Sequence, residues 1–277
     1  MNRLTITLVT TEACNLKCSY CINNSNESQY EIKITNFNED SIMSFLKRMQ
    51  VQHNMKTNVI DAPMLVLVGG EPLISPQVIN IISRVLSETS YLIYLMTNGT
   101  FNFKNLNEQV NYIRHRDRVM FDVSFHYLEL VKRNKLDVFV ENINYLIKNP
   151  PNWKRVKAIA TPEYSDAEIN LINITYKKFN PVWGEFIGIY DGKKYPASYT
   201  EAECEKFNLD ASIREPKINN GILECSALQH TLEIYNNKVY TCSDIRTNGV
   251  ALEKFNLKDT SFKCSIKHCH CPERNQL

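Results

Sequence analysis

Short runs of aliphatic and β-branched residues alternate with longer amphipathic stretches from Leu4 to about Gly188. Such runs between turn signals predict strands, and apolar residues repeating at intervals of three and four predict helices. The predicted strands are Leu4–Thr10, Met64–Val68, Tyr91–Thr97, Val119–Phe125, Arg155–Thr161 and Val182–Ile187. The predicted helices are Glu39–Gln50, Pro76–Glu88, Leu106–Arg114, Leu136–Lys148 and Ser165–Phe179.

This regular alternation predicts an α/β fold with a largely parallel sheet. Six strand–helix units are too few for a complete eight-unit barrel, so we expect a partial (β/α)6 TIM-like barrel. In such barrels the functional residues lie at the carboxyl ends of the strands. One helix start is marked locally, because Ser165 with Glu168 three residues later forms a capping box.

The pattern weakens after Tyr190, where glycine, proline and asparagine accumulate around one short helix predicted near Glu201–Phe207. A hairpin follows, with alternating runs on both sides of Asn236-Asn237, a pair that tolerates the left-handed turn conformation. We therefore expect three parts: a barrel at residues 1–190, a connector at 191–222 and a small hairpin extension at 223–277.

Composition narrows the class of protein. With 32 Lys and Arg against 30 Asp and Glu, the net charge of +2 gives no electrostatic reason to expect a nucleic-acid partner. The longest aliphatic run, Met64–Val68, is far shorter than a membrane span, and the first residues lack the pattern of a secretory signal. We expect a cytoplasmic protein with no membrane partner.

The nine cysteines say more about the chemistry of the protein than its overall composition does. In a reducing compartment they should be free thiols, which favours metal or redox chemistry over a disulfide framework. Three of them crowd the N-terminus and six occupy the last part of the chain, so two separate sites are implied. Cys204 stands apart in the connector, where a buried, packing role is expected.

The first cysteine group is Cys14, Cys18 and Cys21, directly after the first predicted strand. Three thiolates at spacings of four and three residues can hold a small polynuclear centre, whereas structural zinc normally takes four protein ligands. Three ligands leave one metal corner open. An amine and a carboxylate from a cofactor can chelate an open iron.

This motif resembles the cysteine signature of the radical S-adenosylmethionine (radical SAM) superfamily. Further matches follow the next strands: Gly69-Gly70-Glu71-Pro72 resembles the motif that holds the methionine amino group, and Asn98 lies in the Thr-Asn-Gly that often ends the third strand in the family. Ser124, at the end of the fourth strand, resembles the polar position that contacts the ribose or the methionine carboxylate. Tyr20 matches the aromatic residue near the adenine. Adjacent glycines also allow close backbone approach to a ligand, and a carboxylate can pair with an ammonium.

The resemblance implies a mechanism and a set of cofactors. A [4Fe–4S] cluster on Cys14, Cys18 and Cys21 reduces S-adenosylmethionine, and the resulting 5′-deoxyadenosyl radical removes a hydrogen atom from the substrate. Glu71 would position S-adenosylmethionine. An electron donor such as flavodoxin or ferredoxin is the implied partner. His126 would lie at the active rim as a proton donor or a substrate contact, although an ordinary loop histidine fits its position equally well.

The second cysteine group resembles the SPASM and shorter twitch extensions of these enzymes, in which such a hairpin carries an auxiliary [4Fe–4S] cluster. Its ending departs from the common Cys-x-x-Cys pattern, so the four ligands stay open among the five cysteines. A structural zinc site using His268 or His270 is the competing interpretation. The five candidates are Cys225, Cys242, Cys264, Cys269 and Cys271.

Two substrate classes stay open within the family. The enzyme could oxidise a small metabolite such as a sugar, cyclitol or nucleoside, or it could be a peptide maturase that cross-links or epimerises a ribosomally made precursor. The cysteine motif begins at residue 14, which leaves no room before it for a leader-binding domain and favours the small substrate. A non-enzymatic metal-binding module is disfavoured because it would have no use for open coordination.

Overall fold

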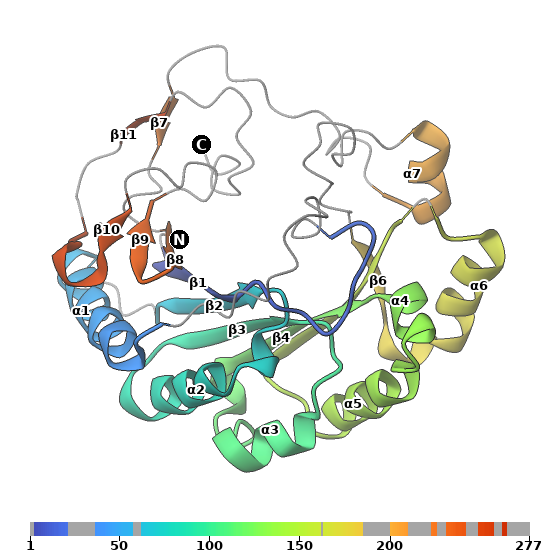
Figure 1. Ribbon diagram of the computed structural model, residues 1–277, viewed down its shortest axis with the longest axis horizontal. Helices are drawn as coiled ribbons and strands as arrows, with labels where there is room; N and C mark the ends of the chain where they lie inside the picture. The colour runs from blue at the N-terminus through green and yellow to red at the C-terminus, as the bar shows by residue number, and fades with distance from the viewer. Residues whose placement is uncertain are drawn as a thin grey trace.

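The computed structural model describes residues 3–21, 37–57, 62–161, 163–184, 200–209, 223–225, 231–241, 249–257 and 262–264. Its centre is a curved sheet, in the strand order β10-β9-β8-β1-β2-β3-β4-β5-β6 (Figure 1). Strands β1 to β6 are parallel to their neighbours. Their bounds are β1 Thr5–Thr11, β2 Met64–Gly69, β3 Leu92–Thr97, β4 Val119–Phe125, β5 Trp153–Ile159 and β6 Val182–Gly184. The predicted α/β fold with a partial barrel is confirmed.

Helices α1 to α6 lie along the convex side of this sheet, and α7 lies near β6 at the far edge of the sheet (Figure 1). The helices are α1 Glu39–Thr57, α2 Pro76–Glu88, α3 Phe103–Val110, α4 Tyr127–Lys132, α5 Leu136–Lys148, α6 Asp166–Thr175 and α7 Glu201–Phe207. Short 3₁₀ turns occupy η2 Pro72–Ile74, η3 Arg116–Arg118, η4 Lys177–Phe179 and η7 Leu252–Lys254. None of the helices within the described ranges is both long and apolar enough to cross a membrane.

Alternate strand residues build the two faces of the sheet. On β3, for example, Ile93 and Leu95 are buried in the core with the helices, whereas Tyr94 and Met96 are only half-buried. The same two-residue period runs through β2 and β4, as expected for a sheet with one face packed and the other facing a cavity. The concave face therefore carries the half-buried residues that are available for binding.

Local capping signals explain where the helix predictions succeed and fail. Helices α2 and α5 have the predicted bounds, and the predicted capping box of α6 is present. Helix α3 was predicted at Leu106–Arg114, but it starts three residues earlier because Asn102 caps it, and it ends before Asn111, which is left-handed with φ of 51°. The predicted helix Ser165–Phe179 divides into α6 and η4, and α4 was not predicted.

The predicted hairpin is formed by β8 (Thr231–Tyr235) and β9 (Lys238–Tyr240), with both turn asparagines in the left-handed region. Strand β8 also pairs in parallel with β1, so the hairpin extends the barrel sheet at its first strand. The short strand β10 (Val250–Ala251) continues the sheet beyond β9. A separate two-stranded ribbon joins β7 (Leu223–Cys225) to β11 (Phe262–Cys264).

Candidate functional site

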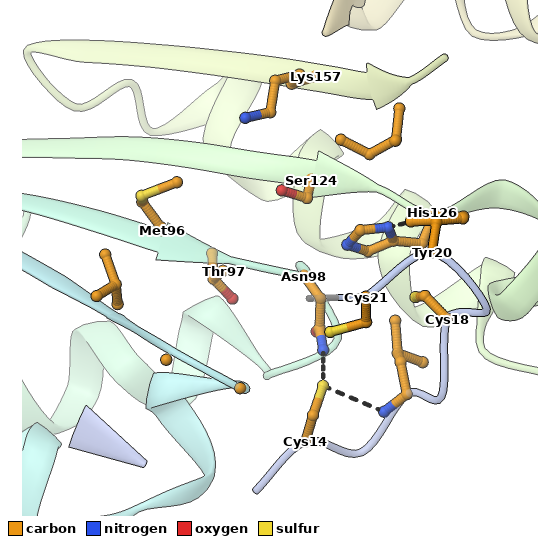
Figure 2. A pocket seen from close by; sticks show the side chains of 15 residues that line it. Cys14, Cys18, Tyr20, Cys21, Met96, Thr97, Asn98, Ser124, His126 and Lys157 are labelled. Atoms are coloured by element: carbon orange, nitrogen blue, oxygen red, sulfur yellow. Dashed lines mark hydrogen bonds between the residues drawn. The ribbon is translucent and has the colours of Figure 1, made fainter. Parts of the chain in front are cut away.

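The N-terminal cysteine loop closes over the carboxyl ends of the central strands and lines a cavity of about 260 Å³ (Figure 2). Its walls bring together nearly all the residues that the sequence predicts for the first site. Glu71 and Pro72 are the two exceptions. The lining residues are Cys14, Leu16, Cys18, Tyr20, Cys21, Val68, Gly69, Gly70, Met96, Thr97, Asn98, Ser124, His126, Lys157 and Ile159.

At Gly69 and Gly70, the end of β2 packs directly against the backbone that leads into the cysteine loop. The backbone N–H of Gly70 donates to the carbonyl of Thr11 at 2.7 Å, and the N–H of Glu71 donates to that of Ala13 at 2.8 Å. A Cβ atom would lie 2.2 Å from the Thr11 oxygen at Gly69 and 2.1 Å from the Ala13 oxygen at Gly70. Gly69 also has φ of +144°, which a side chain would strain.

Polar side chains after β3 and on α4 hold the rest of the loop in place. The backbone N–H of Lys17 donates to the carboxylate of Glu129 on α4 at 2.9 Å, and Glu129 in turn pairs with Arg133, directly after the helix. The side chain of Asn15 contacts Thr100 at 2.8 Å and Asn98 at 2.8 Å. The loop is therefore fixed to the ends of both β3 and β4, and the helix α4 that sequence analysis missed supplies one of its anchors.

The cysteine environment favours a positively charged group. Burial raises the pKa of Cys14 to about 11, with the negative charge of Glu71 adding to the effect, and it raises the pKa of Cys18 to about 12, with the charge of Cys21 adding to it. The Cys14 sulfur accepts hydrogen bonds from the Leu16 N–H at 3.4 Å and the Asn98 amide at 3.6 Å (Figure 2). Metal cations reverse this effect of burial, because a coordinating thiol loses its proton outright.

The spacing of the thiols fits a cluster better than a single ion. Among the residues that the structure describes, no three His, Cys, Asp or Glu side chains lie close enough to share one metal ion. The three cysteines instead surround a cavity, with donors directed at the sulfur of Cys14. Thiolates arranged around a space of this kind fit a [4Fe–4S] cluster, whose potential is adjusted by such hydrogen bonds.

Glu71 is fully buried and connects two strand ends. Its carboxylate accepts hydrogen bonds from the Thr97 hydroxyl at 2.8 Å, the Asn98 N–H at 2.7 Å and the Leu73 N–H at 3.1 Å. Its side chain does not line the cavity. Inside the protein it orients the Thr97–Asn98 segment, and its contact with a cofactor ammonium stays a prediction.

Burial raises the pKa of Glu71 from 4.5 to about 7, against the three hydrogen bonds, which lower it. The unfolded chain thus releases this proton at lower pH than the folded chain does. The protonated Glu71 side chain therefore contributes about 3 kcal/mol to the free energy of unfolding. This contribution is fully present below about pH 4.5 and is lost as the pH rises to about 7. We expect Glu71→Gln to remove that slope from urea unfolding curves.

Glu88→Gln is the control for this comparison. Ion pairing with Arg84 and Lys47 lowers the pKa of Glu88 to about 2, outside the window of interest, so its substitution should leave the slope between pH 4.5 and 7 unchanged. If Glu71→Gln and the native chain lose stability in parallel over this window, the prediction is wrong.

His126 and Tyr20 form a pair at the cavity wall. The Tyr20 hydroxyl lies 2.7 Å from His126 Nδ1, and their ring centroids are 5.7 Å apart (Figure 2). Burial and the nearby Lys157 lower the pKa of His126 to about 4. The imidazole is therefore neutral near pH 7, which suits hydrogen bonding or proton acceptance rather than the donation of a proton from a charged ring.

Sequence analysis missed Met96 and Lys157, which both line the cavity from inward-facing positions of β3 and β5. Their signal was available in the two-residue alternation of the predicted strands, because both lie in phase with other inward-facing residues.

Two members of the second cysteine group lie in described strands. Cys225 ends β7 opposite Phe262, and Cys264 ends β11 opposite Leu223, so these cysteines occupy positions two residues apart on paired strands. Cys204 is buried in the core on α7, as expected for a packing residue. The remaining candidates lie outside the described residues: Cys242, Cys269, Cys271, His268 and His270.

Comparisons with known proteins bear on this site. Residues 8–170 match the family described as the Radical SAM superfamily. The chain is 25% identical over 181 residues to 7-carboxy-7-deazaguanine synthase from Clostridium acetobutylicum, which covers 62% of this chain and 70% of that one. The crystal structure of BtrN in complex with AdoMet and 2-DOIA aligns with a TM-score of 0.43 and 12% identity, over 87% of this chain and 74% of that one.

Proposed function

The chain belongs to the radical SAM superfamily of enzymes, and on this premise we propose that it removes a hydrogen atom from a small metabolite such as a sugar, a cyclitol or a nucleoside. The observation that carries the proposal is the shared cavity. Three cysteine thiols line it together with the Gly69–Gly70 backbone and the polar ends of β3 and β4. A relative named as a synthase of 7-carboxy-7-deazaguanine supports a small-molecule substrate.

Each residue has a role in this proposal. Cys14, Cys18 and Cys21 hold a [4Fe–4S] cluster, which together with S-adenosylmethionine supplies a 5′-deoxyadenosyl radical when bound. The Gly69–Gly70 backbone receives the methionine part of S-adenosylmethionine, because it reaches the cavity with no side chain in the way. Residues that contact the cofactor or orient such contacts are Tyr20, Glu71, Pro72, Asn98 and Ser124.

His126 is assigned to the substrate side of the cavity. Tyr20 occupies Nδ1, and the low pKa keeps the ring neutral, so the imidazole offers one free nitrogen for hydrogen bonding. Enzymes of this superfamily need a reductant, for which a flavodoxin or a ferredoxin is the proposed donor.

The second cysteine group is proposed to hold an auxiliary [4Fe–4S] cluster. Pairing of β7 with β11 supports it, since it brings Cys225 and Cys264 from distant parts of the sequence to neighbouring strands. A net two-electron oxidation needs an acceptor for the electron left on the substrate, and a cluster can serve where zinc cannot. Cys242, Cys269 and Cys271 are the candidates for the other ligands.

The proposed function is tested with the purified, anaerobically reconstituted chain. With dithionite and S-adenosylmethionine, we expect release of 5′-deoxyadenosine and methionine in equal amounts, measured by liquid chromatography. The same mixture without dithionite is the control. A fully reconstituted protein that releases no 5′-deoxyadenosine, with or without added cell metabolites, would contradict the proposal.

A further inference from the structure

The side chain of Asn98 forms a closed ring of hydrogen bonds with Asn15 and Thr100. The Asn15 amide donates to the Thr100 hydroxyl at 2.8 Å, this hydroxyl donates to the Asn98 side-chain oxygen at 2.7 Å, and the Asn98 amide donates to the Asn15 side-chain oxygen at 2.8 Å. Because each of the three groups donates once and accepts once within the ring, the side chains hold one another in a single orientation.

This ring fixes which end of the Asn98 amide points to the first cysteine. The backbone N–H of Thr100 also donates to Asn98 Oδ1, at 3.0 Å, and a backbone N–H can only donate. The side-chain oxygen of Asn98 must therefore lie on the Thr100 side, with its NH₂ group on the other. One hydrogen of this NH₂ group goes to Asn15, and the second is left for the Cys14 sulfur at 3.6 Å (Figure 2).

Asn142 on α5 holds the turn that carries Thr100. Its amide donates to the Gly99 carbonyl at 2.8 Å, and its side-chain oxygen accepts from the backbone N–H of Phe103 at 3.2 Å. The two contacts tie both ends of the turn between β3 and α3 to the core, where Asn142 is buried. Gly99 permits this close approach to α5, because its φ is +71° and a Cβ atom there would lie 2.8 Å from the Phe139 ring.

We propose that Asn142 and Thr100 are positioning residues that direct the Asn98 amide to the Cys14 sulfur and thereby raise the reduction potential of the first [4Fe–4S] cluster. This inference rests on the proposed function, in which Cys14 is a ligand of that cluster. Reduction adds a negative charge that the sulfur atoms share, so an N–H directed at one of them stabilises the reduced form more than the oxidised form.

The orientation of the amide matters because its two ends have opposite effects. A side chain of Asn98 rotated by half a turn would place its oxygen, and not its NH₂ group, against the Cys14 sulfur. The oxygen would repel the charge that reduction adds, and the cluster would be harder to reduce. Thr100 and Asn142 contact neither Cys14 nor the cavity directly, so they act on the potential only through Asn98.

Redox titration of the anaerobically reconstituted chain, followed by electron paramagnetic resonance, measures this potential. The signal that disappears when Cys14, Cys18 and Cys21 are all replaced with alanine belongs to the first cluster. We expect Thr100→Val, which removes the hydroxyl group, and Asn142→Ala each to lower the equilibrium constant of reduction about tenfold. That change is a shift of about 59 mV to more negative potential for a one-electron couple. Thr100→Ser keeps the hydroxyl group and should retain the native potential.

Asn144→Ala is the matched control, because Asn144 is a half-buried asparagine on the same helix, and we expect it to keep the native potential. Iron analysis of every variant should give the native content, which separates an effect on the potential from a loss of the cluster. An unchanged potential in both Thr100→Val and Asn142→Ala would overturn the proposal, and so would a loss of iron in these two variants. A native chain that assembles no first cluster would overturn the proposed function as well, and iron analysis distinguishes that result from a cluster whose potential does not change.

Discussion

Replacing Cys14, Cys18 and Cys21 together with alanine is expected to reduce release of 5′-deoxyadenosine to the level seen without protein. The three thiols line one cavity, and no other described cysteine lies there to replace them. The expected loss of iron is about four atoms per chain, the content of one [4Fe–4S] cluster. Iron analysis and the 5′-deoxyadenosine assay on anaerobically reconstituted protein measure the two effects.

Cys204→Ala is the control for the triple variant. Cys204 is buried on α7 within the core and does not line the cavity. Its substitution should therefore leave the iron content per chain and the amount of 5′-deoxyadenosine released at the native values. Iron retained by the triple variant would report the second cysteine group: about four atoms fit the proposed auxiliary cluster, and one zinc with no iron fits the zinc alternative. Product release by the triple variant would refute the assignment of the first site.

Substituting Gly70 with alanine is expected to destabilise the chain by about 3 kcal/mol and to weaken S-adenosylmethionine binding at least tenfold. The new Cβ would lie 2.1 Å from the oxygen and 2.5 Å from the carbonyl carbon of Ala13, and 2.7 Å from the oxygen of Glu12. These are backbone atoms, which cannot rotate away as a side chain can. The cysteine loop must therefore move, and Cys14 follows Ala13 directly. Urea unfolding and calorimetry measure the two effects.

Gly249→Ala offers a matched comparison. Its Cβ would also be crowded, at 2.4 Å from the nearest atom, but that atom belongs to the ring of Tyr240, a side chain that can adjust. Neither Gly249 nor Tyr240 lines the cavity, so the affinity of the Gly249→Ala variant for S-adenosylmethionine should stay unchanged. If Gly70→Ala binds S-adenosylmethionine as tightly as the native chain does, the close contact between β2 and the cysteine loop is not what shapes the site.

The elements that the sequence predicted well are those with local signals. Helix α2 begins at a proline, and the hairpin turns at two asparagines that accept the left-handed conformation. The first site was also readable, because the motifs that follow β1, β2, β3 and β4 lie at the same end of a parallel sheet.

The features that the sequence did not predict depend on long-range contacts. Glu71 accepts hydrogen bonds from residues 26 and 27 positions away. The direction of its side chain, toward the end of β3 and not into the cavity, therefore follows from the pairing of β2 with β3. The cavity position of Lys157 depends on the curvature of the sheet as well as on its phase within β5. No local rule indicates that β8 pairs with β1.

The pairing of β8 with β1 has a consequence for biosynthesis. Translation delivers β1 first and β8 more than two hundred residues later, yet each needs the other to satisfy its backbone hydrogen bonds. During synthesis one edge of β1, the strand that leads into the cysteine loop, stays open to pairing with other chains. Contacts between such distant residues also slow folding. A nascent chain of this protein is therefore exposed to aggregation until its last third has left the ribosome, which makes protection by a chaperone most valuable during that interval.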